Sequence, residues 1–536
     1  MTRQQSLPHQ HIGKRIAAVA LALTSLVVGV PAATADTADT SAPVVDWKPC
    51  PTYSDDVLRY RGVPADRLPA YRALLNRMEC GTAAVPVDYR RPRGKQITVA
   101  FTRLKAVNQA RRLGALALNP GGPGGSGYLM PLDVSLANVE TAKLNERYDL
   151  IGFDPRGVGY STTVNCEPPA RGPAPTWPLT KAAAKEMYDR EVAANKACGQ
   201  SDPEFLGQLT TENVARDLDR IRAGLGERKL NFLGISWGTW LGAVYRSAFP
   251  ASAGRVFLDS VAPPHWRFDE FVNARAAATE RVAGRMMEWL AQRNDTYGFG
   301  TTAAQVKAAI MALGRDFDAN PRNFTDLPLP VNGEVIAVST LQPSPVWPEA
   351  AQVLKELRDA TGPTAPPTVK QVLGGGPRPP APPGTPAQAN PVMGRATLCN
   401  EDPSRLGFDA AWADYQRLVT GNQLTGRTTR FSANCAGWPL PVQEYQVRHG
   451  NGPLVLAGHR NEAVSVFEWT AEMRKAVGGK VYTVEDDVHG SVLRVPECAA
   501  DLVGFFNTGR IDKGCAGVPA PQTTTATQEF RLDLTA

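Results

Sequence analysis

The sequence predicts an α/β fold, with a mostly parallel central sheet, helices on both faces of the sheet and an inserted cap domain. Strand-like apolar runs alternate with helix-like stretches over residues 97–260 and again over residues 454–506. Such alternation is typical of parallel strands joined by crossover helices. The alternation is absent from residues 262–450. We therefore interpret that segment as an insertion between two parts of one sheet.

The chain of 536 residues begins with a pattern typical of a secretory signal peptide. Basic residues precede an apolar run, residues 16–30, which ends near Ala33-Thr34-Ala35. About 15 apolar residues are too few to span a bilayer, so we expect residues 1–35 to be cleaved and the protein to be secreted. Removing three basic residues and no acidic ones takes the formal charge from +6 to about +3. This small charge predicts no nucleic-acid partner and, after cleavage, no membrane partner.

The mature chain is expected to divide into a core and a cap. Residues 36–261 form the first part of the core, and residues 451–518 form the second part. The cap, residues 262–450, contains a segment dominated by proline and glycine, residues 362–391. Such a composition buries too little apolar surface to become ordered, which predicts a flexible loop. We expect residues 519–536 to be a flexible tail.

All eight cysteines lie in the exported part of the chain. An even number of cysteines in an oxidising compartment favours four disulfides. The number alone leaves the connectivity open, but pairing between nearest neighbours closes the shortest loops. The expected pairs are Cys50 with Cys80, Cys166 with Cys198, Cys399 with Cys435, and Cys498 with Cys515. No cysteine or histidine cluster has the spacing of metal ligands, so we expect no metal and no catalytic cysteine.

The sequence Gly-Ile-Ser-Trp-Gly at residues 234–238 lies between a strand-like run, residues 230–235, and a helix-forming stretch, residues 239–248. A serine at a sharp strand-to-helix turn raises its hydroxyl above the sheet, and the flanking glycines avoid collisions within the turn. This arrangement is a nucleophile elbow, although the bare pattern also occurs without function in glycine-rich chains. We expect Ser236 to be a nucleophile.

A glycine-rich loop, residues 119–127, follows the strand-like run at residues 114–118. Bare backbone N–H groups in such a loop can stabilise an oxyanion. We expect Gly122 and Trp237, which directly follows the nucleophile, to form the oxyanion hole. A phosphate-binding loop is the alternative, but the Gly-Lys-Ser/Thr of a P-loop is absent.

These motifs, together with the sequence Phe-Asp-Pro-Arg-Gly-Val-Gly-Tyr-Ser at residues 153–161, resemble those of the secreted tripeptidyl aminopeptidases. That family is a group of α/β-hydrolases related to prolyl aminopeptidases. Further matching segments are residues 47–50, 79–80, 85–89, 435–439 and 489–490. The resemblance covers most of the mature chain, and the proline-rich segment least. It implies an α/β-hydrolase fold, a cap over the active site, no cofactor, and a triad in the order serine, acid, histidine.

The resemblance implies that Ser236 is the nucleophile and that His489, which follows the last strand-like run, is the triad histidine. Three other histidines remain after signal removal: His265, His449 and His459. We interpret each of these as a polar surface or turn residue.

The triad acid is the point at which this chain departs from the family. After the run at residues 454–458 the family has a short loop with aspartate, but here Asn461 occupies that place. In a serine protease, the equivalent change from aspartate to asparagine lowers turnover by about ten-thousand-fold. We expect Glu462 to act from the next position, because its extra methylene compensates for the shift. Two alternatives remain open: Asp259 could act from a neighbouring strand, or a weakened enzyme could use Asn461.

An aminopeptidase also needs a negative charge for the substrate's ammonium group. Three extended residues span about 10 Å. The distance between this negative charge and the nucleophile would therefore set the length of the peptide that is removed. Glu401 and Asp402 on the cap are the expected amine-binding residues, with Asp269 and Glu270 as second choices.

The predicted function is a secreted, monomeric serine exopeptidase that removes short peptides, most simply tripeptides, from free N-termini through an acyl-enzyme. Two alternatives stay open. One is a secreted esterase or amidase that acts on a small metabolite. The other is a catalytically weakened homologue that binds peptides.

Overall fold

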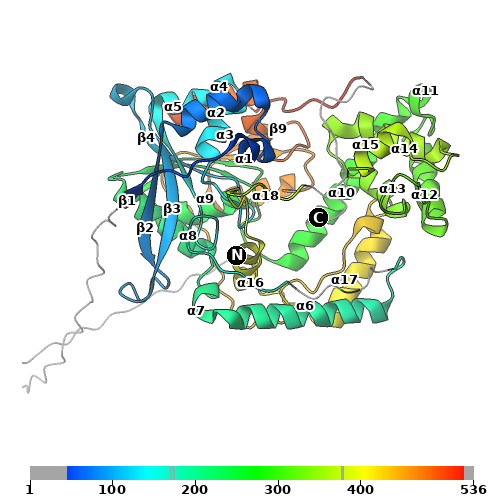
Figure 1. The fold of residues 1–536 in the computed structure, drawn as a ribbon, viewed down its shortest axis with the longest axis horizontal. Helices are drawn as coiled ribbons and strands as arrows, with labels where there is room; N and C mark the ends of the chain where they lie inside the picture. The colour runs from blue at the N-terminus through cyan, green and yellow to red at the C-terminus, as the bar shows by residue number, and fades with distance from the viewer. Residues whose placement is uncertain (1–44, 169–171, 173–175, 376–378, 513, 524–536) are drawn as a thin grey trace, which may run out of the picture. The chain divides into compact units, whose positions relative to one another are not determined.

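The computed structural model describes residues 45–168, 172, 176–375, 379–512 and 514–523 (Figure 1). The predicted signal peptide, residues 1–35, lies outside the described residues. Within these ranges no helix combines the length and the apolar character needed to cross a membrane.

The described residues contain a nine-stranded sheet in the order β1-β2-β3-β5-β4-β6-β7-β8-β9. Its strands are β1 (Val45–Lys48), β2 (Met78–Pro86), β3 (Gln96–Leu104), β4 (Gly114–Asn119), β5 (Tyr148–Phe153), β6 (Leu230–Ile235), β7 (Ala253–Asp259), β8 (Leu454–His459) and β9 (Lys480–Val484). Strands β4 to β9 pair with one another in parallel. Strands β1, β2 and β3 pair antiparallel at one edge. The predicted mostly parallel sheet is confirmed.

Helices cover both faces of this sheet. Outside the segment between β7 and β8 they are α1 (Asp55–Tyr60), α2 (Leu68–Leu75), α3 (Met130–Ala137), α4 (Val139–Ala142), α5 (Leu144–Arg147), α6 (Lys181–Ser201), α7 (Pro203–Leu206), α8 (Thr211–Gly224), α9 (Trp237–Ala248), α18 (Phe467–Val477) and α19 (Pro496–Thr508). Successive side chains of a strand point to opposite faces. Phe232 of β6 therefore packs with α8 and α9, whereas the adjacent Leu233 packs with α3 and α19.

The described residues between β7 and β8 form helices, drawn in green and yellow in Figure 1. They are α10 (Phe268–Ala291), α11 (Asn294–Tyr297), α12 (Ala303–Ala319), α13 (Gly333–Thr340), α14 (Trp347–Asp359), α15 (Pro367–Leu373), α16 (Pro391–Glu401) and α17 (Phe408–Gly421). Helices α10 to α15 enclose their own hydrophobic core around Met286, Trp347 and Leu354, apart from the two cores of the sheet. We call this body the helical cap.

Two helices pack against a different domain from the one that the sequence predicted for them. Helix α16 belongs to the predicted cap, but Met393 and Ala396 place it in the core of the sheet. Helix α6 belongs to the predicted core, but its Ala184 packs with Trp412 and Tyr415 of α17, which Figure 1 shows beside it. Helical periodicity marks which face of a helix is buried without specifying its partner, which explains both differences.

The prediction of a flexible loop over residues 362–391 is wrong for part of that segment. Helix α15 lies within it, and Val369 and Val372 are buried in the core of the helical cap. Asn390, near the end of the segment, caps α16 by accepting hydrogen bonds from the Val392 and Met393 N–H groups. A few apolar residues at helical spacing and one capping side chain are enough to order a proline-rich stretch.

The beginning of the predicted flexible tail is also held in place. The carbonyl oxygen of Pro521 accepts hydrogen bonds from Nε1 of Trp289, in α10, at 2.8 Å and from Arg293, between α10 and α11, at 3.1 Å. Ala520 packs against the core of the helical cap. Residues 524–536 of the predicted tail lie outside the described residues.

The structure joins the cysteines as nearest neighbours: Cys50 with Cys80, Cys166 with Cys198, Cys399 with Cys435, and Cys498 with Cys515. The sequence separations are 30, 32, 36 and 17 residues. Loops of this size limit the unfolded chain enough to stabilise the fold by roughly 3–4 kcal/mol each in the chain-entropy picture. Reduction should therefore lower the melting temperature by many degrees. Peptide mapping without reduction checks the pairing, and a peptide joining Cys80 to Cys166 would contradict it.

Candidate active site

The predicted nucleophile, Ser236, lies at the sharp turn between β6 and α9. Its backbone has φ 58° and ψ −127°, a region that a non-glycine residue adopts at a cost of about 1–3 kcal/mol. Gly234 is needed beside it, because a Cβ atom there would lie 2.2 Å from the carbonyl oxygen of Gly238. Ser236 is partly exposed. This strained, solvent-reachable serine has the geometry of a nucleophile elbow.

The glycine-rich loop packs directly against this turn. A Cβ atom on Gly121 would lie 2.8 Å from Cβ of Ser236, so only glycine allows this approach. Asn119 holds the loop by accepting a hydrogen bond from the Gly121 N–H at 3.0 Å. Gly122 follows directly, and Trp237 begins α9, where the first N–H groups have no acceptor within the helix. The two predicted oxyanion donors thus belong to the two segments that meet at Ser236.

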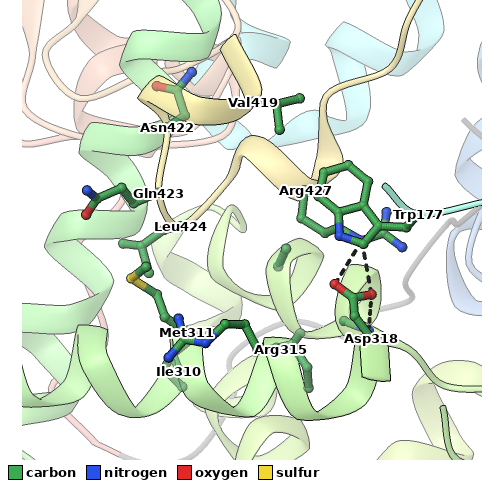
Figure 2. Close-up of a pocket in the computed structure, with 14 residues that line it drawn as sticks. Trp177, Ile310, Met311, Arg315, Asp318, Val419, Asn422, Gln423, Leu424 and Arg427 are labelled. Atoms are coloured by element: carbon green, nitrogen blue, oxygen red, sulfur yellow. Dashed lines mark hydrogen bonds and ion pairs between the residues drawn. The ribbon is translucent and has the colours of Figure 1, made fainter. Parts of the chain in front are cut away.

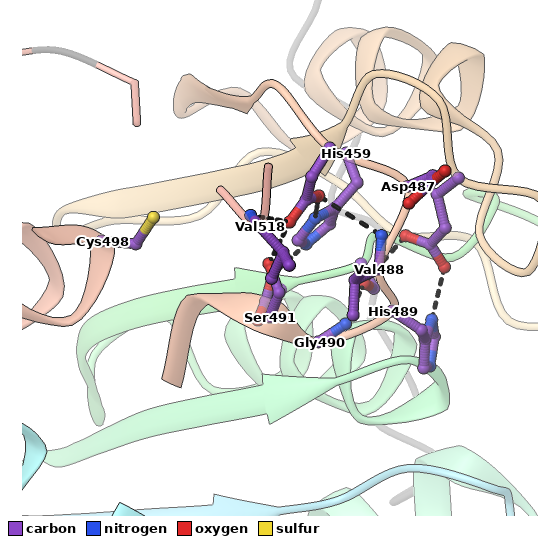
Figure 3. A network of polar contacts seen from close by, with 12 residues as sticks. His459, Asp487, Val488, His489, Gly490, Ser491, Cys498 and Val518 are labelled. Atoms are coloured by element: carbon purple, nitrogen blue, oxygen red, sulfur yellow. Dashed lines mark hydrogen bonds and ion pairs between the residues drawn. The ribbon is translucent and has the colours of Figure 1, made fainter. Parts of the chain in front are cut away.

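Glu462 and His489 are in contact. Oε1 of Glu462 forms a hydrogen bond with Nδ1 of His489. Figure 3 shows His489 at the edge of a polar network. The Ser465 N–H donates to the same oxygen at 2.7 Å, and Oγ of Ser260 donates to Oε2 at 2.9 Å. Glu462 is 2% exposed, whereas the His489 side chain is 31% exposed. A buried carboxylate thus orients an imidazole that a substrate can reach.

The other two possible acids lie elsewhere. Asp259 is fully buried, and its Oδ1 contacts Nε2 of His459 at 2.8 Å. Asn461 donates its backbone N–H to the carbonyl oxygen of Asp486 at 2.9 Å. The turn from His459 to Glu462 is closed by a 3.3 Å hydrogen bond between their backbones. The turn therefore places residue 462, rather than 461, against His489.

The interpretation of His459 as a polar surface or turn residue is wrong. It is the last residue of β8 and is fully buried between Asp259, at the end of β7, and Asp486, after β9. Its Nδ1 lies 2.6 Å from Oδ1 of Asp486. Burial alone lowers the pKa of His459, but these two carboxylates outweigh it and raise the pKa to about 10. The sequence did contain a signal for this role, because two of the predicted parallel strands end in aspartate and in histidine. His265 and His449 are exposed, as expected.

Because His459 is charged in the folded state, the stability of the protein should decrease at alkaline pH. Its pKa of about 10 in the fold exceeds the unfolded value near 6.5. The stabilisation is therefore complete below about pH 6.5 and is lost as the pH rises through 10. Urea unfolding between pH 6 and 10 measures this loss, and His459→Gln should flatten the curve. If the free energy of unfolding depended on pH in the same way in the wild type and in His459→Gln, the positive charge assigned to His459 would be contradicted.

Glu401 and Asp402 do not fit the amine-binding role expected for them. Glu401 accepts hydrogen bonds from the Thr211 N–H and from Nε1 of Trp240, and burial raises its pKa to about 7. Asp402 is fully buried and accepts from the Phe268 N–H at 3.2 Å. Both carboxylates are thus occupied by protein donors. The expectation fails because α16, which carries Glu401, packs on the core of the sheet.

The second choices lie near the start of α10. Asp269 lines a small cavity of about 70 Å³ together with Phe268, Tyr415 and Phe431. Its Oδ1 atom lies 3.6 Å from Nε of Arg267 and makes no hydrogen bond with any described residue. Glu270, in contrast, is exposed and pairs with His265 and Arg267. Asp269, and not Glu270, is among the residues that line this cavity.

A larger pocket of about 260 Å³ lies among α12, α13 and α17 (Figure 2). Its wall includes Trp177, with the guanidinium of Arg427 at 4.3 Å from the ring and 3.2 Å from Asp318. Neither Ser236 nor His489 is among the residues that line this pocket or the cavity beside Asp269.

Comparison with known proteins places the chain in a family. A family model for the alpha/beta hydrolase fold matches residues 114–333, and a model described as TAP-like protein matches residues 423–522. The chain is 31% identical to the tripeptidyl aminopeptidase of Streptomyces lividans over 465 residues, which are 81% of this chain and 82% of that protein. It is 31% identical to the tripeptidyl aminopeptidase of Streptomyces coelicolor over 478 residues, 83% and 84% of the two chains.

A shorter match supports the same assignment. The chain is 34% identical to the serine protease Hip1 of Mycobacterium tuberculosis over 234 residues, which are 41% of this chain and 40% of that protein. The chain is a serine hydrolase and a member of the tripeptidyl aminopeptidase family of α/β-hydrolases.

Proposed function

We propose that this protein is a secreted serine exopeptidase that removes tripeptides from free N-termini, with Ser236, His489 and Glu462 as its catalytic triad. The contact between Glu462 and His489 carries the proposal, because it supplies an acid despite the asparagine at 461. The similarity to two tripeptidyl aminopeptidases supports the choice of substrate.

In the proposed reaction, His489 has its proton on Nδ1, which donates to Glu462. Its Nε2 takes the proton of the Ser236 hydroxyl as the oxygen attacks the carbonyl carbon of the third residue. The N–H groups of Gly122 and Trp237 stabilise the oxyanion. His489 then gives its proton to the departing amine, which leaves an acyl-enzyme. A water molecule, deprotonated by His489, hydrolyses that ester and frees Ser236.

The surroundings of Glu462 suit this role. Its two oxygens accept three hydrogen bonds from His489, Ser465 and Ser260. These hydrogen bonds fix the position of the carboxylate. A fixed Glu462 carboxylate holds the tautomer of His489 and stabilises the imidazolium that forms when Ser236 loses its proton.

Asp269 replaces Glu401 and Asp402 as the proposed partner of the substrate's ammonium group. Asp269→Asn should raise KM for a tripeptide substrate by about 10-fold or more, since a charged hydrogen bond contributes about 1.5–3 kcal/mol, and should change kcat little. Glu270→Gln, on the adjacent exposed acid, is the matched control. Equal kcat/KM in both variants and the wild type would reject Asp269.

The substrate class is tested with a tripeptide p-nitroanilide and its N-acetylated form. An exopeptidase that requires the free amine should hydrolyse the first at least about 100-fold faster, because the half-buried Asp269 carboxylate would lose its charged hydrogen bond to the ammonium group. Equal hydrolysis of both would favour the esterase or amidase alternative. A fluorophosphonate probe identifies the remaining alternative, because a catalytically silent homologue would not be labelled at Ser236.

Secretion is proposed from the pattern at residues 1–35, and the four disulfides suit an oxidising compartment. N-terminal sequencing of the exported protein should begin at Asp36. A retained Met1 in protein from the medium would contradict cleavage.

A further inference from the structure

His459 joins three parallel strands at their carboxyl ends, beside the proposed triad. Asp259 ends β7, His459 ends β8, and Asp486 follows β9. The imidazole contacts Asp259 at 2.8 Å through Nε2 and Asp486 at 2.6 Å through Nδ1. All three side chains are fully buried or nearly so. The mechanism described above uses none of them.

The two carboxylates depend on His459 to different degrees. Asp486 also accepts from Oγ of Ser491 at 2.6 Å and from the Val518 N–H at 2.9 Å. Asp259 has no such support, because its Oδ2 is buried and makes no hydrogen bond with any described residue. The charge on Asp259 is therefore compensated by His459. The charged groups that face the imidazole are Asp259 on β7, Asp486 after β9 and Glu462 on its own loop.

This cluster lies where the loops of the proposed acid and histidine meet. Residues 459–462 carry Glu462, and residues 485–491 carry His489. The His459 contact with Asp486 joins the two loops, and the Asn461 N–H reinforces the join by donating to the Asp486 carbonyl oxygen at 2.9 Å. Figure 3 shows His459 and His489 in one connected network.

The end of β7 contacts both loops as well. Ser260, directly after Asp259, donates through Oγ to Glu462 at 2.9 Å and accepts from the Gly490 N–H at 2.8 Å. A separation of Asp259 from His459 would therefore displace Ser260, and with it the support of the Glu462 carboxylate. The ion cluster and the proposed triad thus involve the same three segments: the end of β7, the loop after β8 and the loop after β9.

We propose that His459 is a positioning residue, which holds the loop of Glu462 against the loop of His489 by bridging Asp259 and Asp486. This inference rests on the proposed roles of Ser236, Glu462 and His489. It predicts that loss of the imidazole slows the chemical step, because two buried carboxylates then repel each other where the loops meet. Substrate affinity should change little, since His459 is fully buried.

The test compares His459→Gln with the wild type and with His449→Gln, a substitution of an exposed histidine. Two rates are measured: turnover of a tripeptide p-nitroanilide and the labelling of Ser236 by a fluorophosphonate. At pH 8 we expect kcat and the labelling rate of His459→Gln to fall by about 30-fold or more, with KM within about threefold of the wild type. His449→Gln should match the wild type.

Two further measurements separate positioning from a general loss of folding. At pH 6 the deficit of His459→Gln relative to the wild type should shrink to about fivefold or less, because protonation of one carboxylate removes the repulsion. The double variant His459→Gln/Asp259→Asn, which removes one of the two charges, should recover to within about fivefold at both pH values.

Three results would overturn the inference. The first is a folded His459→Gln variant with the kcat of the wild type. The second is a deficit in kcat that is equally large at pH 6, at pH 8 and in the double variant. The third applies if His459→Gln does not fold: a kcat of the double variant more than about 30-fold below that of the wild type. If the probe does not label wild-type Ser236, the proposed function fails instead.

Discussion

Ser236→Ala should reduce hydrolysis to near background while the protein stays folded. The reason is chemical: the acyl-enzyme needs an oxygen at the elbow, and a water molecule in its place lacks the same activation. Removal of the nucleophile from other serine proteases lowers kcat by about 10⁴- to 10⁶-fold. The strained backbone at φ 58° should be retained, because it is enforced by the close approach of Gly234 and Gly238.

The measurement is kcat/KM on a tripeptide p-nitroanilide, with circular dichroism to verify the fold. Ser252→Ala is the matched control, since this serine lies after α9, away from the elbow. The control should retain wild-type activity. More than about a hundredth of the wild-type rate in Ser236→Ala would contradict the assignment of the nucleophile.

Glu462→Gln should lower kcat by about 10³- to 10⁴-fold with little change in KM, because the carboxylate contributes once the imidazolium forms. The geometry explains the size of the effect. Oε1 of Glu462 meets Nδ1 of His489, and an amide nitrogen at that position would present a hydrogen to a nitrogen that must itself donate. The remaining donors, from Ser465 and Ser260, cannot replace the lost charge.

Asn461→Asp and Asp259→Asn are the two comparison variants. With Glu462 as the acid, Asn461→Asp should change kcat little or lower it, because a second negative charge nearby disfavours the first. Asp259→Asn should affect kcat mildly, because Asp259 faces His459 rather than His489. A large gain in Asn461→Asp together with an indifferent Glu462→Gln would favour the weakened-enzyme alternative.

Local pattern was sufficient to predict the elements that present the proposed nucleophile and its oxyanion donors. The strand, the serine between glycines and the following helix are adjacent in the chain, and residues 119–127 follow a strand directly. Such segments are specified by periodicity and by the steric needs of the turn, both of which a sequence displays. The mostly parallel sheet follows from the same alternation.

The identity of the histidine's partner required the tertiary structure. The sequence favoured Glu462 but left Asn461 and Asp259 open as alternatives. The contact between Glu462 and His489 depends on the turn from His459 to Glu462 and on the meeting of two loops that follow β8 and β9. Glu401 fails as an amine-binding residue for a related reason, because its surroundings depend on where α16 packs.

The sequence by itself thus determined the fold class and the positions of Ser236 and His489 relative to their strands. These depend on short-range spacing. The tertiary structure alone decided that Glu462 contacts His489 and that His459 is a buried cation between Asp259 and Asp486. Those outcomes depend on which strands are neighbours in the sheet. The order of the strands in space, rather than the distance between residues along the chain, decides which charged groups lie next to a buried charge.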